Sequence, residues 1–188
     1  MEDLLDRVIT RTWKSKIREL QGAHFYWMRK LPLFVSFPRT GSEWLNCIME
    51  LYFDRPRLRR NRITYLSEKR RDWMWFHDHD HPQNLRHSNV LYLYRNPVET
   101  IFSQIYYNIT SHPQTLLPVE NISNPVNAPD TLVADYARLY HRHLRKWLIE
   151  PGHAREYVRY ENLTQYPVEE FQKICRFFEK PYAPDAVS

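Results

Sequence analysis

The chain has 188 residues, of which 43% are hydrophobic and 15% aromatic, and its net charge is +5. This composition excludes a disordered polar segment, and the length predicts one domain, 1–188, with a substantial buried core. No stretch reaches the roughly 20 apolar residues of a membrane-spanning helix, and the first residues lack the apolar core of a signal peptide. The two cysteines, Cys47 and Cys175, lie in apolar helical patterns and are expected to be reduced core residues. We therefore expect a cytoplasmic protein.

Hydrophobic spacing predicts strands and helices that alternate along the chain. Residues 1–22 have an amphipathic helical pattern, so 1–30 is expected to be a helical extension. Strands are expected at 33–37, 73–77, 89–94 and 156–160, and helices at 44–52, 97–106, 131–149 and 168–178. Two basic clusters, 55–62 and 69–71, are expected to be solvated loops, with an anion-attracting rim or a nucleic-acid-binding patch as the alternatives. The alternation predicts an α/β fold of three layers, in which helices cover both faces of a central parallel sheet.

The most informative segment, 33–46, reads as a short buried strand, a tight polar turn and a helix. Pro38 ends the strand, and the turn contains a cation, two hydroxyl residues and one of only three glycines in the chain. Such a joint directs free backbone N–H groups and the positive end of a helix dipole at an anion, and Arg39 adds a fixed charge. The turn is expected to bind phosphate or sulfate, with an ordinary strand–helix joint as the alternative. It is not the ATP-type loop, because it has one glycine and no lysine.

A second cation and a histidine cluster follow two later strands. Arg95 comes directly after the strand at 89–94, where open α/β sheets bind ligands, and a surface ion pair is the alternative. His77, His79 and His81 alternate with aspartates at the end of the strand expected at 73–77. Histidine and aspartate are metal-ligand types, but the sequence offers no matching cluster elsewhere to complete a site. No metal is therefore expected.

Four segments occur in an order that is typical of one enzyme family. They are Phe37–Leu45, Leu93–Pro97 with Ser103, Tyr160–Leu163, and the final helix and turn, Phe171–Tyr182. Together they resemble the sulfotransferases that use 3′-phosphoadenosine 5′-phosphosulfate (PAPS), over about residues 31–182. The resemblance implies a P-loop-like sulfotransferase fold and PAPS as cosubstrate. It also implies in-line transfer of a sulfuryl group to a hydroxyl or amine of a carbohydrate or small molecule.

The resemblance assigns the first turn to the 5′-phosphosulfate. Backbone N–H groups of 40–43 would hold the 5′-phosphate, with Gly41 allowing close approach, and the hydroxyls of Thr40 and Ser42 would assist. Arg39 stands where most members have lysine. It would stabilise negative charge on the leaving oxygen electrostatically, because arginine is the poorer proton donor.

The resemblance assigns the remaining contacts to the rest of the nucleotide. Arg95 and Ser103 would share the 3′-phosphate, and Tyr160 would contact the nucleotide, with a core aromatic at the end of a strand as the alternative. Trp44 would stack on the adenine, with packing in the core as the alternative. Glu43 departs from the pattern, because many members have a hydroxyl residue there, and a carboxylate beside a phosphate is unfavourable unless it points outward.

The family also places a catalytic histidine just after a strand between the two phosphate motifs. Sulfuryl transfer to a hydroxyl needs a group that accepts the proton, and histidine titrates near neutrality. The end of the strand favours His77 as this base, with His79 as the alternative.

Two features limit the resemblance and keep other functions open. Typical members continue into a basic, glycine-containing segment that closes over the 3′-phosphate, and this segment is expected to be missing here. A nucleotide phosphotransferase is one alternative, weakened by the absence of a Gly-Lys-[Ser/Thr] ending and of an evident acidic magnesium ligand. A non-catalytic nucleotide-binding protein is the other. No nucleic-acid partner is expected, because RNA-binding signatures are absent. The acceptor is expected to bind at the loops 54–72 and 111–130.

Overall fold

The computed structural model describes residues 30–59, 72–79, 89–110, 124–150 and 154–184. The helical extension expected at 1–30, the basic cluster at 69–71 and His81 therefore fall almost wholly outside the described residues, as does 111–123 of the expected long loop. None of the described helices is long and apolar enough to cross a membrane.

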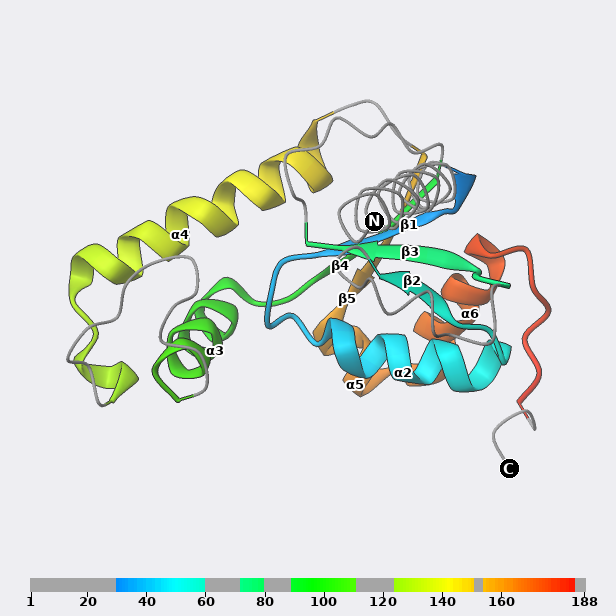
Figure 1. The fold of residues 1–188 in the computed structure, drawn as a ribbon, viewed down its shortest axis with the longest axis horizontal. Coiled ribbons are helices and arrows are strands. Elements are labelled where there is room, and N and C mark those ends of the chain that lie inside the picture. The colour runs from blue at the N-terminus through cyan, green and yellow to red at the C-terminus, as the bar shows by residue number, and fades with distance from the viewer. Residues whose placement is uncertain (1–29, 60–71, 80–88, 111–123, 151–153, 185–188) are drawn as a thin grey trace, which may run out of the picture.

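A five-stranded sheet forms the centre of the molecule, and all of its strands are parallel (Figure 1). In spatial order they are β2 (Arg57–Arg59), β3 (Trp75–Asp78), β1 (Leu33–Ser36), β4 (Asn89–Tyr94) and β5 (Ala154–Arg159). β1 pairs with β3 on one side and β4 on the other, so the strand that precedes the phosphate-type turn is central. The expected α/β fold with a parallel sheet is confirmed.

Helices follow the strands as the alternating pattern predicts. They are α2 (Ser42–Phe53), α3 (Pro97–Thr110), α4 (Asp130–Leu144), α5 (Tyr160–Gln165) and α6 (Pro167–Phe177), with a 3₁₀ turn at Pro125–Asn127 and a π-helical turn at Arg145–Ile149. Pro97 and Pro167 each begin a helix, where the missing N–H removes no helical hydrogen bond. The helix expected at 131–149 changes to π-helical geometry after Leu144.

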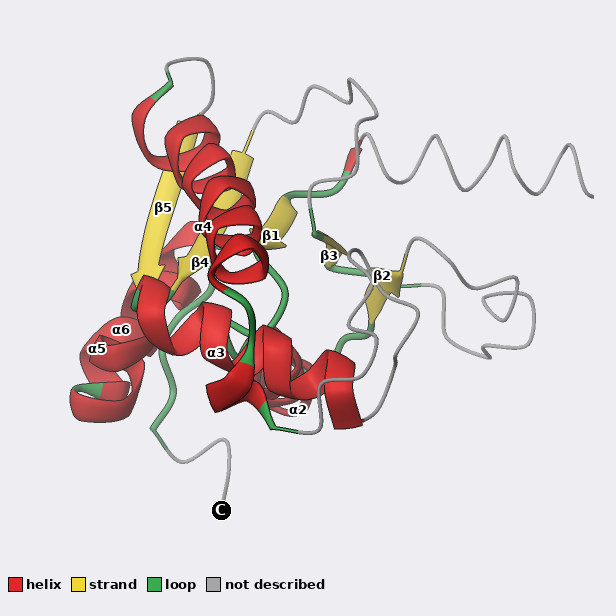
Figure 2. Cartoon of the chain, turned by 90° about the vertical axis from the view of Figure 1, so that its left-hand side faces the viewer, coloured by secondary structure: helices red, strands yellow, loops and turns green. Residues whose placement is uncertain are grey.

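Alternate side chains of β1 enter two different cores. Phe34 packs in a core that α2, α5 and α6 cover. Leu33 and Val35 face the other side, where Trp147 of the π-helical turn contributes to the packing. Figures 1 and 2 show helices on both sides of the sheet, which confirms the three-layer arrangement. Because both faces are covered, the central strands read as continuous apolar runs in the sequence.

Helix α3 lies beside α4 rather than over the centre of the sheet (Figure 1). Ile105 of α3 packs with Leu132 and Tyr136 of α4. The buried amide of Asn108 donates to the Tyr136 hydroxyl and accepts from Gln104 at 2.8 Å. This polar network holds α3 against α4. Ser103 of α3 also contacts Arg39 in the turn that follows β1, at 3.4 Å.

Three local expectations are wrong. The first basic cluster contains a strand, β2, because Leu58 packs into the core and the Arg57 side chain is buried instead of solvated. Cys175 is buried and free as expected, whereas Cys47 is free but exposed. Tyr160 does not end a strand, because β5 stops at Arg159 and Tyr160 begins α5.

Candidate functional site

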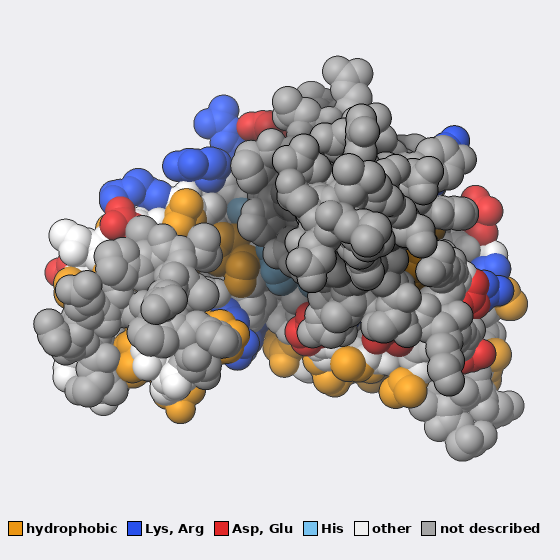
Figure 3. Space-filling view, viewed as in Figure 1, with side chains coloured by type: hydrophobic (Ala, Val, Ile, Leu, Met, Phe, Trp, Pro, Cys, Tyr) orange, Lys and Arg blue, Asp and Glu red, His pale blue; other side chains and the backbone are white. Residues whose placement is uncertain are grey.

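A pocket of about 420 Å³ lies where the parallel strands end. Its lining combines residues that follow β1, β3 and β4 with residues of α3: Arg39, Gly41, Ser42, Glu43, Trp44, His79, Arg95, Ser103 and Tyr107. The carboxyl ends of parallel strands meet at one edge of a sheet, which explains why segments far apart in sequence converge there. Figure 3 shows arginine or lysine and histidine side chains in a hollow between the α3–α4 side of the molecule and the rest.

The turn after β1 has an unusual backbone. Arg39 and Gly41 both have positive φ angles, of 69° and 92°. Only glycine adopts such angles without steric cost, so Arg39 is held in a conformation that non-glycine residues rarely adopt. The buried Thr40 hydroxyl stabilises the turn by donating to the carbonyl of Phe37 at 2.7 Å. The Thr40 side chain therefore holds the backbone of the turn in place and does not line the pocket.

Gly41 also lies against the ring of Tyr160. A Cβ atom built on Gly41 would come within 2.6 Å of two ring carbons of Tyr160. Tyr160 in turn contacts Trp44, with ring centroids 6.2 Å apart in an edge-on arrangement. Tyr160, at the start of α5, therefore packs against the turn. The side chain of Trp44 is 46% exposed and lines the pocket instead of packing in the core.

The Arg39 side chain extends from the turn to α3. Its Nε donates to the Ser103 hydroxyl at 3.4 Å, and its guanidinium carbon lies 4.5 Å from the centre of the Tyr107 ring. The aromatic face and the hydroxyl hold the cation in the pocket without neutralising it. Ser103, which the resemblance pairs with Arg95, contacts Arg39 in this structure.

Arg95 reaches the same pocket from the end of β4. Its guanidinium lies 4.6 Å from the centre of the Tyr160 ring and donates to the Glu99 carboxylate at 2.7 Å and 3.0 Å. It also approaches the carbonyl of Arg39, at 3.5 Å from Nη1. The two arginines expected at the two phosphates therefore line one pocket, and Arg95 is paired with a carboxylate one helical turn away.

Two side chains fix the backbone around Arg95. The Tyr140 hydroxyl accepts from the N–H of Arg95 at 3.0 Å and donates to its carbonyl at 2.7 Å. Burial raises the pKa of Tyr140, so the hydroxyl stays protonated as this double contact requires. Glu161 accepts from the N–H of Asn96 at 2.7 Å. Burial alone would raise the pKa of Glu161, but the hydrogen bonds from Asn96 and from its own N–H hold it below the usual range.

The rings of His77 and His79 at the end of β3 are in contact, with centroids 4.8 Å apart, but only one of them lines the pocket. His77 is buried within the strand, and its ring stacks on Phe34 with centroids 5.0 Å apart. His79 lies just after the strand and lines the pocket. Its Nδ1 is 2.9 Å from the carbonyl oxygen of Ser36 at the end of β1. His79 rather than His77 therefore shares a pocket with the two arginines.

Glu43 forms an ion pair with Arg57, a residue of the basic cluster 55–62 that was expected to be a solvated loop. Its Oε2 accepts from Arg57 Nη2 at 2.6 Å, and the side chain of Arg57 is only 1% exposed. A second glutamate of α2, Glu50, accepts from the backbone N–H of Arg57 at 3.2 Å and lies 3.5 Å from its Nε. Glu43 lines the pocket, but its charge is compensated by a guanidinium beneath it.

Comparison with known proteins identifies the family. A model of the sulfotransferase domain matches residues 32–188. The chain belongs to the sulfotransferase domain family. Among solved structures, the chain is similar to mouse sulfotransferase SULT7A1, solved in complex with PAP (3′-phosphoadenosine 5′-phosphate), with a TM-score of 0.50 and 14% identity. The match covers 85% of this chain and 64% of SULT7A1, so the chain spans less than two thirds of that relative. No curated protein sequence matched.

Two residues at or beside the pocket of this sulfotransferase domain, Tyr107 and Arg57, were not assigned from the sequence. Tyr107 lines the pocket, and its helical spacing from Ser103 was a usable signal in the sequence, because residues four apart lie on one face of a helix. Arg57 had no signal beyond the charge of its cluster. Within the described residues, no group of three or more histidine, cysteine or acidic side chains is arranged to hold a metal ion.

Gly41→Ala tests how strictly the domain depends on this turn. The substitution is expected to lower the free energy of unfolding by about 1–3 kcal/mol, because alanine is strained at a φ of 92° and its Cβ meets the Tyr160 ring. Urea unfolding measures the loss. The double variant Gly41→Ala/Tyr160→Ala removes the collision but keeps the backbone strain. A Gly41→Ala protein as stable as wild type would contradict this geometry.

Proposed function

We propose that this chain is a sulfotransferase that uses PAPS and transfers its sulfuryl group to a hydroxyl or amine of a carbohydrate or small molecule. The observation that carries the proposal is the convergence of Arg39, Arg95 and the start of α2 on one pocket. Family membership and the parallel-sheet fold support it. Arg39 and Arg95 come from different strand ends, which suits a ligand with a negative group at each end.

The pocket chemistry fits a nucleotide with two phosphate groups. The N–H groups at the start of α2, the Ser42 and Ser103 hydroxyls and the two guanidinium groups are hydrogen-bond donors that phosphate oxygens accept. The carboxylates nearby, Glu43 and Glu99, are each paired with an arginine. Trp44 offers an exposed aromatic surface for the base.

His79 is the residue that we assign as the base. A backbone carbonyl only accepts hydrogen bonds, so the 2.9 Å contact with the Ser36 carbonyl, shorter than the 3.3 Å contact with the Ser36 hydroxyl, favours the tautomer with the proton on Nδ1 of His79. In the neutral ring Nε2 then carries the lone pair and accepts the proton of the acceptor hydroxyl. This assignment replaces His77, which is packed against Phe34 inside the sheet.

The transfer follows from these positions. The acceptor hydroxyl gives its proton to Nε2 of His79 as its oxygen bonds to sulfur, and the bond from sulfur to the bridging oxygen breaks. The electron pair of that bond remains on the 5′-phosphate oxygen, where Arg39 and the N–H groups of the turn stabilise the charge. Arginine stays protonated, so Arg39 acts by its charge and not as an acid.

Calorimetric titration with PAP and with ATP, each with and without Mg²⁺, tests the proposal. We expect PAP to bind in the micromolar range or tighter without a metal, and ATP to bind more weakly whether or not Mg²⁺ is present. A phosphotransferase would prefer ATP with Mg²⁺, because the metal bridges the phosphates that it transfers. Preference for Mg²⁺–ATP, or no binding of PAP, would overturn the proposal.

A further inference from the structure

The pocket holds a carboxylate at the position that most needs positive charge. Glu43 is in the first turn of α2, at the positive end of the helix dipole. A phosphate bound at the start of this helix would lie beside Glu43 and compete with it for the same N–H groups. An uncompensated carboxylate there would weaken binding of any dianion.

The buried guanidinium of Arg57 forms an ion pair with the Glu43 carboxylate. Glu43 and Glu50 are two helical turns apart, so they lie on one face of α2, and β2 places Arg57 against that face. The Arg57 side chain is 1% exposed, so water screens its charge poorly. Its Nη2 is 2.6 Å from Glu43, whereas its Nε is 3.5 Å from Glu50, and the shorter contact is the one at the pocket.

We propose that Arg57 is a positioning residue for nucleotide binding, which makes the turn compatible with a phosphate by neutralising and holding the Glu43 carboxylate. It acts through Glu43 and does not line the pocket itself. The inference rests on the proposed nucleotide site. A bound nucleotide would cover Glu43, 68% exposed without one, and exclusion of water strengthens the attraction to Arg57 as well as the repulsion from phosphate.

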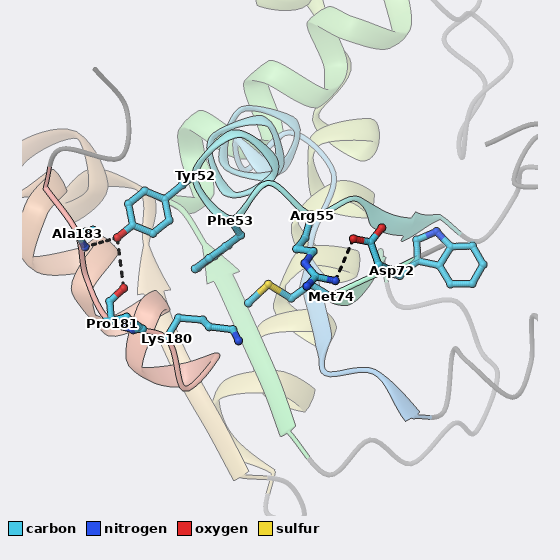
Figure 4. Close-up of a pocket in the computed structure, with 9 residues that line it drawn as sticks. Tyr52, Phe53, Arg55, Asp72, Met74, Lys180, Pro181 and Ala183 are labelled. Atoms are coloured by element: carbon cyan, nitrogen blue, oxygen red, sulfur yellow. Dashed lines mark hydrogen bonds and ion pairs between the residues drawn. The ribbon is translucent and has the colours of Figure 1, made fainter. Parts of the chain in front are cut away.

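The chain offers a matched control two residues away. Arg55 carries the same charge and pairs with Asp72 at 2.9 Å. It lines a different pocket, of about 600 Å³, where Figure 4 shows its guanidinium directed at Asp72. Removing Arg55 changes the net charge as much as removing Arg57 does, but leaves Glu43 paired. Methionine replaces either arginine with an apolar chain of similar length, so it occupies the space of the buried Arg57 side chain without adding a new polar group there.

Calorimetric titration of PAP into wild type, Arg57→Met, Arg55→Met, Glu43→Gln and Arg57→Met/Glu43→Gln tests the inference. We expect Arg57→Met to weaken PAP binding by about tenfold or more, because Glu43 then loses the buried guanidinium that compensates its charge beside the phosphate. Arg55→Met should stay within about twofold of wild type. Adding Glu43→Gln to Arg57→Met should restore affinity to within about threefold, which a loss of structure alone would not allow.

The outcomes separate this inference from the proposed function. Absence of PAP binding by wild type overturns the proposed function and this inference with it. Wild-type binding that Arg57→Met leaves unchanged, or a double variant as weak as Arg57→Met, overturns this inference alone. If Arg57→Met does not fold, Glu43→Gln decides. The PAP affinity of Glu43→Gln is expected to be no more than about threefold weaker than that of wild type. An affinity more than about tenfold weaker overturns the inference.

Discussion

At the proposed nucleotide site, replacing Arg95 by alanine is expected to abolish a preference for PAP over adenosine 5′-phosphate, which lacks only the 3′-phosphate. A guanidinium that donates to a phosphate contributes about 1.5–3 kcal/mol, so the affinity for PAP should fall roughly 10–150-fold. Affinity for adenosine 5′-phosphate should change by less than about threefold, because that ligand has no group for Arg95 to bind. Calorimetric titration of both nucleotides gives the ratio directly.

The fold of this variant should persist, which makes the result interpretable. The Arg95 side chain contacts Glu99 and the face of Tyr160, whereas Tyr140 holds its backbone, and alanine keeps those backbone contacts. Arg39→Ala is the matched control and should weaken both nucleotides alike, because both have the 5′-phosphate. The contact between Arg39 and Ser103 makes the opposite outcome informative. If Arg39→Ala loses the preference and Arg95→Ala keeps it, the two arginines serve opposite ends of the nucleotide from those proposed.

Most of the sheet was predictable from local sequence because its strands are buried on both faces. Phe34, Val35 and Leu91 are fully buried, and such strands appear as short continuous apolar runs. β2 was not predictable, because two of its three residues are arginines. The burial of Arg57 depends on Glu43 and Glu50, which α2 brings to it only in the folded chain.

The site was predictable to the extent that its residues follow strand ends. Arg39 and Arg95 come directly after apolar strands, and topology alone brings such positions together. Which histidine lines the pocket was not predictable, because it depends on where β3 ends. A strand at 73–77 favours His77, but β3 runs from Trp75 to Asp78, so His77 stays within the sheet and His79 is the first histidine beyond it. A shift of one or two residues at a strand end is beyond what local propensity determines.

His79→Ala is expected to lower turnover by about 10²–10⁴-fold while leaving the affinity for PAP within about threefold of wild type. In the proposed mechanism the ring accepts a proton only during transfer, so its loss should affect the transition state more than the bound nucleotide. Turnover is followed as release of PAP from PAPS, with 4-nitrophenol and glucosamine as test acceptors. His79→Asn is the closer replacement, because its amide can still donate to the Ser36 carbonyl but does not titrate as a base.

His77→Ala is the matched control, because it removes the same ring two residues away. The stacked contact with Phe34 and the burial of His77 predict a loss of about 1–3 kcal/mol in the free energy of unfolding. Turnover per folded molecule should then stay within about threefold of wild type, since His77 does not line the pocket. The reverse result would be full turnover in His79→Ala and turnover lowered by about 10²-fold or more in His77→Ala. It would assign the role of the base to His77. It would also mean that the ring of His77 leaves Phe34 during the reaction, because a base must reach the acceptor hydroxyl to remove its proton.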